Sequence, residues 1–598
     1  MLLANRFAGA APWDRWRNSL GPAGQADQEL VLATEGRTDY VIVIPAAATT
    51  QDHKAAKDLA HWLGQMTGAA FRIVTDTTPP RETEISVGRT NRRQRVDPED
   101  AVARLGDEGY AIAVRGPKLT LLGGRKRGPI NAVYALLEED LGCRWYAAKA
   151  NRIPRRPTLR VKPVPRRSTP ALRIRDPFYK VAFDATWSLR NRTNAPSAPV
   201  PEKWGGRIDY ALFVHTAHTL VPPGKYFKEH PQYFMLDNSG KRNAHQLCMT
   251  HPDVIRIATE SVLRIMKDKP HCEIISVSKT DGGRTCQCAK CKALDQAEGS
   301  EAASLLYLVN RVAEAVEKHH PKLVISTLAY LETVKPPKTI RPRKNVAIRL
   351  CTDRCMWAHP FTPAEDSDVF SEAITRWSKI HDRIHIWDYV VNFSHYPAPM
   401  PNMDVVAKNI RYFVKHNATG AMEQAAYQCP GGERDLMRSW VMAKLMWDPS
   451  RDVRELMQDF VWGYYGKAAP AVAEYDELLR KTAAQHTESM KNPKGGIRYP
   501  MDSPFLSEDF IDKSTEIFDR AEKLAESDEI RHRVEEARLP IMYVKLCRGP
   551  KFVGSGYAAL IDRFEKIARR VGMTHIKEGP PDLKQKIEQW RKAAAGKK

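Results

Sequence analysis

The pattern of apolar and polar positions divides the chain into three parts, of which the first mixes strands with helices. Short apolar runs bounded by turn residues alternate there with segments whose apolar residues recur at helical spacing. The predicted elements are strands at 40–45 and 84–88, helices at 53–66 and 129–141, and a hairpin at 109–124. They indicate an N-terminal α+β accessory domain over residues 28–163, bounded by a Pro/Arg-rich segment at 152–170 of the stiff linker type.

The middle part, residues 171–432, alternates β-rich runs with longer helical or loop segments, as βα units do. Seven runs have the composition of strands: LRIRDP, ALFVHT, IISVSKTD, KLVISTLAY, NVAIRLC, IHIWDY and TGAMEQ. A central (β/α)8 TIM-like barrel is the natural assembly of such units, although no eighth run is visible.

The last part, residues 433–598, has no strand signal and is expected to form a helical C-terminal domain. Helices are predicted at 435–447, 452–465, 468–484, 507–525, 530–546 and 557–571. The fold class is therefore α/β, and residues 1–27 are expected to form a disordered or processed leader.

Composition and charge narrow the class of protein. Hydrophobic residues make up 42% and charged residues 27% of the 598 residues, which is typical of globular domains, and no apolar run could span a membrane. The net charge of +22 favours an anionic partner, such as an acidic glycan, or simply a soluble surface. Nucleic acid is not favoured, because the arginine clusters are short and scattered. The N-terminus lacks a convincing secretion signal, so localisation stays open.

Acidic residues follow three of the predicted strands, and this pattern points to a function. Asp281, Asp388 and Glu423 each stand at the end of a β-rich run. In an α/β barrel the carboxyl ends of the strands surround the active site, and paired carboxylates there are the usual catalysts of glycosidic-bond hydrolysis. A glycosidase acting on carbohydrate is therefore predicted. No organic cofactor is expected, because no phosphate-cradling glycine loop occurs between a strand and a helix.

Glu423 is the first choice for the proton donor, because burial beside an aromatic such as Tyr427 would raise its pKa. The alternative is a strand-end acid bonded to backbone or to an arginine. Asp388 stands between Trp387 and Tyr389, whose flat faces suit sugar rings, and is a second candidate for catalysis or substrate binding. Alternation puts Asp388 on the opposite side of the strand from both aromatics, so all three share a site only where the strand bends.

Further candidate site residues stand at the ends of the other predicted strands. Asp281, followed by two glycines, is a candidate for orienting a substrate group or for capping its loop. His215 and His218 of the HTAH motif are candidates for binding sugar hydroxyls, for a structural role or for a metal pair. Tyr330 and Asp353 are weaker candidates at the same predicted mouth.

Ten cysteines are too sparse for a disulfide scaffold, but three of them form a C-x-C-x2-C cluster that follows Asp281. Zinc would need a fourth ligand beside Cys286, Cys288 and Cys291, and the candidates elsewhere are Cys248, Cys351 and Cys355. Disulfides and reduced thiols are the alternatives. In each case the cluster would brace the loop that contains Asp281.

Several separate motifs between about 171 and 480 resemble one family. They are HTAHTLVPPGKYFKEHPQYF, QLCMTHP, SVSKTDGGRTCQCAKCKALDQAEGS, LYLVNRVAEAV, LAYLETVKPP and KLMWDPSRD. They look like the domain of unknown function 4838, a group that contains glycoside hydrolase family 163, whose known members are endo-β-N-acetylglucosaminidases acting on N-glycans. The segments GYAIAV, LLGGRKRG and AVYALLEEDLGCRWY resemble the α+β domain that precedes the barrel in β-hexosaminidases and α-glucuronidases.

The predicted reaction is hydrolysis beside an N-acetylhexosamine, with Glu423 as acid/base. The resemblance implies retention through the substrate's own acetamide, with Asp388 or Asp281 as the assisting carboxylate, and an extracytoplasmic location. Two rival functions fit the residues: a non-catalytic glycan-binding protein on the same barrel, and a zinc-stabilised nucleic-acid binder. The sugar, the linkage and the oligomeric state are not predicted.

Overall fold

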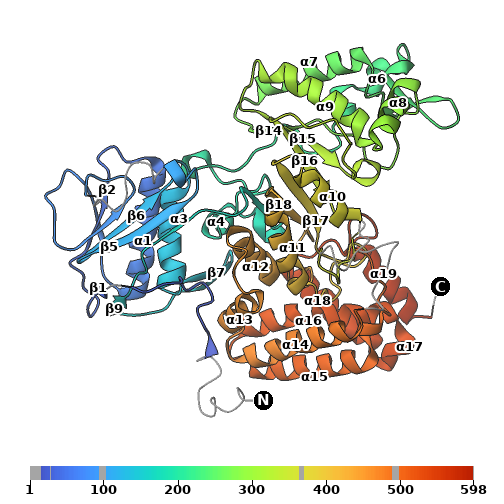
Figure 1. Cartoon of the computed structure of the whole chain (residues 1–598). Coiled ribbons are helices and arrows are strands. Elements are labelled where there is room, and N and C mark those ends of the chain that lie inside the picture. The colour runs from blue at the N-terminus through green and yellow to red at the C-terminus, as the bar shows by residue number, and fades with distance from the viewer. Residues whose placement is uncertain are drawn as a thin grey trace.

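The computed structural model describes residues 15–26, 28–92, 103–353, 355–361, 369–487 and 497–596. Figure 1 shows an N-terminal α+β region, a central region built on a parallel sheet and a C-terminal set of helices. The N-terminal region has its own hydrophobic core. The central region and the C-terminal helices share a second, larger core, because side chains from both pack in one cluster.

The N-terminal region is a six-stranded sheet with two helices packed on it (Figure 1). In sheet order the strands are β10 (Arg166–Ser168), β5 (Tyr110–Arg115), β6 (Lys118–Gly123), β4 (Glu84–Val87), β2 (Val41–Ile44) and β3 (Arg72–Thr75). The helices are α1 (Thr50–Thr67) and α3 (Gly128–Ala135). Helix α1 begins at a capping box formed by Thr49 and Asp52 and ends at Gly68, whose φ of 81° is left-handed.

The Pro/Arg-rich segment at 152–170 is not a free linker. Its strand β9 (Leu159–Val161) pairs with β1 (Leu30–Ala33), and β10 pairs with β5, both antiparallel. Each is an edge strand, and proline is tolerated at sheet edges because an edge strand needs fewer ladder hydrogen bonds. The prolines therefore separate short edge strands that belong to the N-terminal region.

Part of the predicted leader is also packed against the folded protein. Residues 1–14 and 27 lie outside the described residues, whereas Arg15, Trp16 and Ser19 contact helix α13 (Val453–Tyr464). The Trp16 indole and the Ser19 hydroxyl donate to the Asp459 carboxylate at 3.2 and 2.8 Å. Residues 15–26 thus form part of the fold, which corrects the expected leader over that stretch.

The central region is built on six parallel strands in the order β11-β18-β17-β16-β15-β14. Their bounds are β11 (Ile174–Asp176), β14 (Ile274–Ser276), β15 (Val324–Ala329), β16 (Val346–Cys351), β17 (Ile384–Tyr389) and β18 (Ala418–Gln424). The first strand lies beside the last, as in a barrel. The run ALFVHT is not a strand in the structure: an isolated parallel bridge, Tyr210 to Ile274, lies just before it, and its first two residues, Ala211 and Leu212, form backbone hydrogen bonds with Ile274 and Ser276 before the chain leaves the sheet. The described barrel therefore has six strands rather than eight.

Alternation along these strands separates two layers. Ile274 and Val324 pack together inside the curved sheet, whereas Ile275 and Ile325 join the core under the surrounding helices. Helices in contact with the sheet include α9 (Ala302–Glu317), α11 (Met403–Lys415) and α12 (Asp435–Trp447). The same alternation decides which strand-end side chains face the interior of the barrel.

The predicted C-terminal helices are confirmed, with ends that differ by no more than two residues. After α12 they are α13, α14 (Ala469–Gln485), α15 (Glu508–Leu524), α16 (Asp528–Arg548) and α18 (Tyr557–Val571). A further helix, α19 (Leu583–Ala594), packs on α18. Amphipathic repeats predict these helices well, because each one buries a continuous apolar stripe against its neighbours.

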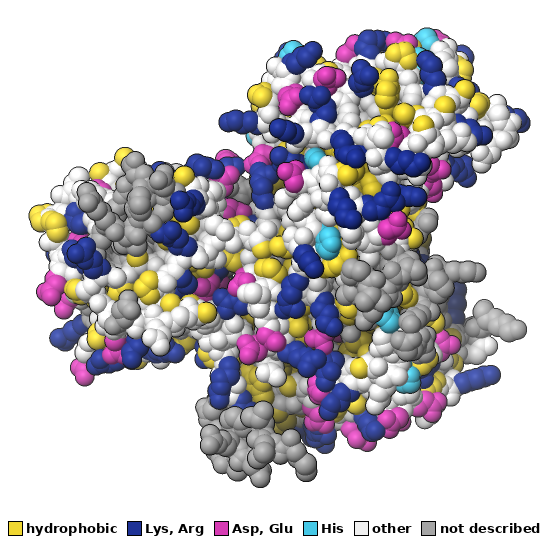
Figure 2. Space-filling model, in the orientation of Figure 1, with side chains coloured by type: hydrophobic (Ala, Val, Ile, Leu, Met, Phe, Trp, Pro, Cys, Tyr) yellow, Lys and Arg dark blue, Asp and Glu magenta, His cyan; other side chains and the backbone are white. Residues whose placement is uncertain are grey.

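Within the described residues, none of the helices combines the length and apolarity that a bilayer crossing requires. On the face drawn in Figure 2, Lys and Arg side chains lie over all three regions, with Asp and Glu side chains among them. On this face the positive charge is therefore dispersed and does not form a single tract.

Candidate active site

Strands β17 and β18 pair in register at the carboxyl end of the sheet, and their side chains point to two different layers. Asp388 lies opposite Glu423, and Tyr389 lies opposite Gln424. The Trp387 indole nitrogen donates to the Gln424 side-chain oxygen at 2.5 Å, and the Trp387 and Tyr389 rings stack with centroids 6.4 Å apart. Trp387, Tyr389 and Gln424 therefore share the inner face of the barrel, and alternation turns Asp388 and Glu423 outward.

Asp388 and Glu423 form a buried carboxylate pair between the sheet and helix α12. Their exposed fractions are 4% and 0%. Asp388 accepts hydrogen bonds from the Thr352 hydroxyl and from the Tyr389 backbone N–H. Among the described residues, no donor reaches either carboxylate oxygen of Glu423. A proton shared with Asp388 supplies the missing donor, because two adjacent buried carboxyl groups cannot both be charged.

Burial, followed by the neighbouring Asp388 carboxylate, raises the pKa of Glu423 well above its ordinary value. Burial also raises the pKa of Asp388, against the hydrogen bond from Thr352. Arg438 of α12 lies on the same outer side, where it donates to the Val390 carbonyl at 2.8 Å. The pair therefore has the electrostatics of a proton donor but no access to solvent. The sequence-based roles of Glu423 and Asp388 are not supported by this placement.

A second group of acids lines the barrel mouth. Lys279, which is buried after β14, forms an ion pair with Glu332 at 3.0 Å, and His215 Nε2 lies 3.8 Å from Asp281 Oδ1. Glu332 and Asp281 expose 25% and 72% of their side chains. A Cβ built on Gly283 would lie 2.0 Å from Glu332 Oε1, so the loop packs directly on the end of this carboxylate.

Tyr330 links the acids of this mouth. Burial, then the charges of Asp281 and Asp353, raise the pKa of the Tyr330 hydroxyl. The Tyr330 ring lies 6.3 Å from the His215 ring, and the Lys279 ammonium lies 5.6 Å from the Tyr330 ring centroid. The structure thus brings together three predicted site residues, Asp281, His215 and Tyr330.

Aromatic side chains and one distant acid form the other wall of the mouth. The Phe213 ring lies 5.8 Å from the Trp387 ring, beside the stacked Tyr389. Glu578, from the segment between α18 and α19, accepts a hydrogen bond from Gln424 at 3.4 Å and one from the Tyr427 hydroxyl at 3.3 Å. The C-terminal region therefore contributes a carboxylate to the mouth.

The two histidines of the HTAH motif have different partners. His215 has a left-handed φ of 53°, and its Nδ1 donates to the Lys279 carbonyl at 3.2 Å. His218 donates from Nε2 to the Ala244 carbonyl at 2.8 Å, in strand β13 (Arg242–Leu247). His215 therefore belongs to the mouth, whereas His218 ties its helical turn to a neighbouring hairpin.

Glu332, Glu578 and Lys279 are mouth residues that were not predicted. Glu332 stands three residues after β15, so the strand-end rule that selected the other acids could have found it. No sequence signal identifies Glu578, which is 154 residues from its partner Gln424. Among the cysteine candidates, Cys248 lies beside Cys286, Cys288 and Cys291. Cys351 instead ends strand β16.

The family described as Domain of unknown function (DUF4838) matches residues 145–477, more than half of the chain. The chain belongs to this family, which confirms the predicted resemblance to it. No curated protein sequence matches the chain. The resemblance to glycoside hydrolase family 163 stays a prediction.

Solved structures similar to this chain are glycoside hydrolases. A family GH115 4-O-methyl-α-glucuronidase with specificity for decorated arabinogalactans has a TM-score of 0.53 and 12% identity, and the match covers 91% of this chain and 77% of that chain. A family 89 glycoside hydrolase from Clostridium perfringens has a TM-score of 0.46 and 10% identity, covering 87% and 65%. The first similarity shows that the chain shares the fold of that enzyme, and at this identity the likeness extends to the fold alone.

Proposed function

We propose that this protein is a glycoside hydrolase that cleaves a glycosidic bond of a complex glycan or polysaccharide at the barrel mouth. The observation that supports this most strongly is the group formed by Asp281, Glu332 and Tyr330 opposite the stacked Trp387 and Tyr389. Carboxylates are the usual proton donors and nucleophiles of glycosidases, and flat rings suit the faces of sugars. The group lies at the carboxyl ends of the strands, where barrel enzymes bind their substrates.

Glu332 is the carboxylate that we assign to direct work at the glycosidic bond, with Asp281 as its partner. Glu332 is partly buried and is held by Lys279 and by close packing of Gly283, so its position is well defined. Asp281 is more exposed and lies near His215 and Tyr330, where it can bind a substrate hydroxyl or amide. A carboxyl group held in place and a second one across the bond are what both retaining and inverting hydrolysis require.

We further propose that the bond lies beside an N-acetylhexosamine, as the resemblance to family 163 implies. The acetamide of such a sugar would lie near Asp281, which could orient it for attack on the anomeric carbon. The glycan-binding alternative uses the same aromatic wall but needs no acid. An experiment that measures binding and turnover separately distinguishes the two.

The test is product release from an N-glycoprotein and from neutral and acidic polysaccharides, analysed by mass spectrometry. Wild type should release a sugar fragment, Glu332→Gln should bind the same substrate without releasing it, and Glu423→Gln should behave like wild type. Glu314→Gln, an exposed acid on α9, is the matched control. Tight binding with no release by wild type from any substrate would favour the glycan-binding protein, and loss of release only in Glu423→Gln would return catalysis to the buried pair.

A further inference from the structure

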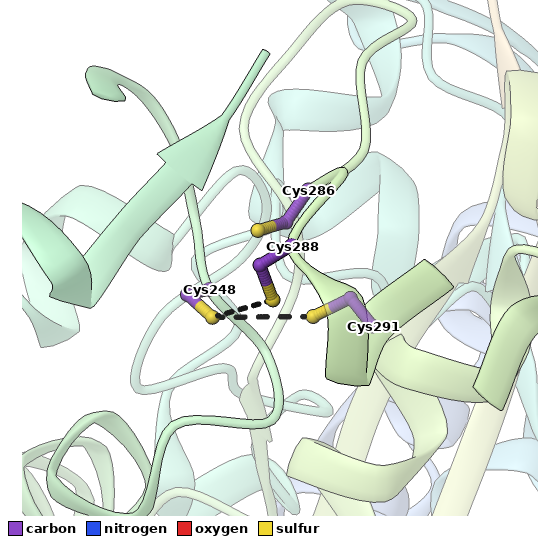
Figure 3. A group of neighbouring side chains, drawn as sticks. All are labelled: Cys248, Cys286, Cys288 and Cys291. Carbon is purple, nitrogen blue, oxygen red and sulfur yellow. Dashed lines mark hydrogen bonds between the residues drawn. The ribbon is translucent and has the colours of Figure 1, made fainter. Parts of the chain in front are cut away.

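Four cysteine side chains from three segments of the chain point toward one another beside the barrel mouth (Figure 3). Cys248 follows the hairpin of β12 (Phe234–Leu236) and β13, and Cys286 and Cys288 lie in the loop after β14. Cys291 stands in the first turn of α8 (Ala289–Glu298). All four are free thiols, three are buried and Cys288 is half-buried.

The separations of the sulfur atoms fit a tetrahedral metal site. Cys248 Sγ lies 3.5 Å from Cys288 Sγ and 4.0 Å from Cys291 Sγ, and all four sulfurs lie within 4.8 Å of one another. Four thiolates bound tetrahedrally to zinc at about 2.3 Å lie about 3.8 Å apart. Sulfurs joined in a disulfide are about 2.05 Å apart, so the quartet is too open for that bond as it stands.

Neighbouring groups stabilise thiolate charge at this position. The Leu236 backbone N–H donates to Cys286 Sγ at 3.4 Å, and the Thr250 hydroxyl lies 3.2 Å from Cys291 Sγ. Cys288 is the N-cap residue of α8, so the positive end of that helix faces the cluster. Donors of this kind orient metal-bound thiolates and balance their charge.

We propose that Cys248, Cys286, Cys288 and Cys291 bind one structural zinc ion. The four thiolates fill the coordination sphere, so the ion has no open position for water or substrate. Its role is to hold the hairpin of β12 and β13, the loop after β14 and the start of α8 together. Zinc is favoured over harder cations because all four ligands are soft sulfurs.

The ion would also position one side of the barrel mouth. Only four residues separate Asp281 from Cys286, and Gly283 between them packs on Glu332. Zinc should therefore order the loop that contains Asp281 and packs on Glu332. This consequence rests on the proposed glycosidase function, whereas the metal site itself does not, and metal content is measured without any substrate.

The first test is the zinc content of the full chain, purified under reducing conditions and measured by mass spectrometry of the element. Wild type should hold about one zinc ion per chain, and the double variant Cys286→Ser/Cys291→Ser should hold almost none. Cys547→Ser, in α16, is the matched control and should keep the metal. A wild-type protein that takes up no zinc when reduced and supplied with it would overturn the proposal, as would a disulfide between two of the four cysteines in the protein as purified.

The second test needs no variant and so does not depend on whether the double variant folds. Cobalt(II) is exchanged for the bound metal in wild type, and the absorption spectrum is recorded. Tetrahedral thiolate ligation should give intense charge-transfer and visible bands that zinc displaces. A spectrum typical of oxygen or nitrogen ligands, or no bound cobalt, would contradict the four-cysteine site.

Discussion

The two faces of strands β17 and β18 present different residues and differ completely in what they can do. On the inner face, Trp387, Tyr389 and Gln424 point into the barrel mouth, where they contact one another and Glu578. On the outer face, one residue along, Asp388 and Glu423 are sealed under helix α12. An acid at a strand end is thus a candidate catalyst only when the alternation of side chains along the strand places it on the face toward the barrel interior.

The two faces also differ in electrostatics. The outer pair is dry, and burial together with mutual repulsion raises the pKa of Glu423 well above its usual range. The acids of the barrel mouth, Asp281 and Glu332, are in contrast accessible to solvent. They lie beside Lys279, His215 and Tyr330. A strongly perturbed carboxyl group is therefore not by itself a sign of the active site, because structural burial produces the same shift.

The largest expected effect comes from removing the carboxylate of Glu332 at the barrel mouth. Glu332→Gln should lower kcat/KM about 10²- to 10⁴-fold, because the amide can neither donate a proton nor attack. Glu423→Gln should stay within about threefold of wild type. Steady-state rates on the substrate found by product release measure both. If Glu423→Gln lost activity and Glu332→Gln kept it, the buried pair would be the catalytic site and the barrel mouth would not.

A smaller effect is expected at the aromatic wall of the inner face. Trp387→Ala should raise KM about tenfold, equal to about 1.4 kcal/mol, through loss of a stacking surface. The kcat value should change much less, since the acids stay in place. Trp462→Ala, a half-buried tryptophan in α13, is the control and should leave KM unchanged. An equal loss of kcat would mean that Trp387 positions the catalytic acids.

The buried pair of Asp388 and Glu423 should affect the stability of the folded protein in a way that depends on pH. The folded state raises the pKa of Glu423, so between the unfolded and folded pKa the native protein binds more protons and its stability falls as pH rises. Glu423→Gln mimics the protonated acid and removes this loss. Its melting temperature should exceed that of wild type at about pH 8, with a difference that shrinks toward about pH 5. A constant difference across that range would contradict proton sharing by the pair.

The smallest effect is expected where the C-terminal region meets the mouth. Glu578→Ala should reduce kcat/KM less than about fivefold, because its two hydrogen bonds, to Gln424 and Tyr427, are long and it stands at an exposed position. Rates at low substrate concentration measure it best. A loss as large as that of Glu332→Gln would make Glu578 a member of the catalytic group.

Local patterns predicted much of the fold. The helices at 435–447 and 557–571 were predicted with their observed ends; the second buries one amphipathic stripe, whereas the first is buried on almost every side. The run ALFVHT failed as a strand, because a ladder needs a partner in register along its length, and the pairing with β14 stops at Leu212. The segment 152–170 failed as a linker, since its short strands are stabilised by pairing with residues far away in the chain.

The candidate site was predicted in part. Asp281, His215 and Tyr330 meet at the mouth because strand ends converge in any barrel, whatever its details. Glu332 also follows a strand end, so the same rule could have predicted it. Glu578 and the choice of Cys248 as the fourth thiol depend on chain segments that come together only in the folded protein.

The sequence by itself determined the α/β class, the order of the elements, the family and the acids at the strand ends, because these follow from local periodicity and from motifs. Only the tertiary structure decided which of those acids face the mouth and which lie under α12. The physical reason is that a strand alternates with a period of two, so a one-residue difference in where it starts exchanges its two faces. Hydrophobic burial against the helices sets that choice, and this burial exists only once strands and helices have packed together.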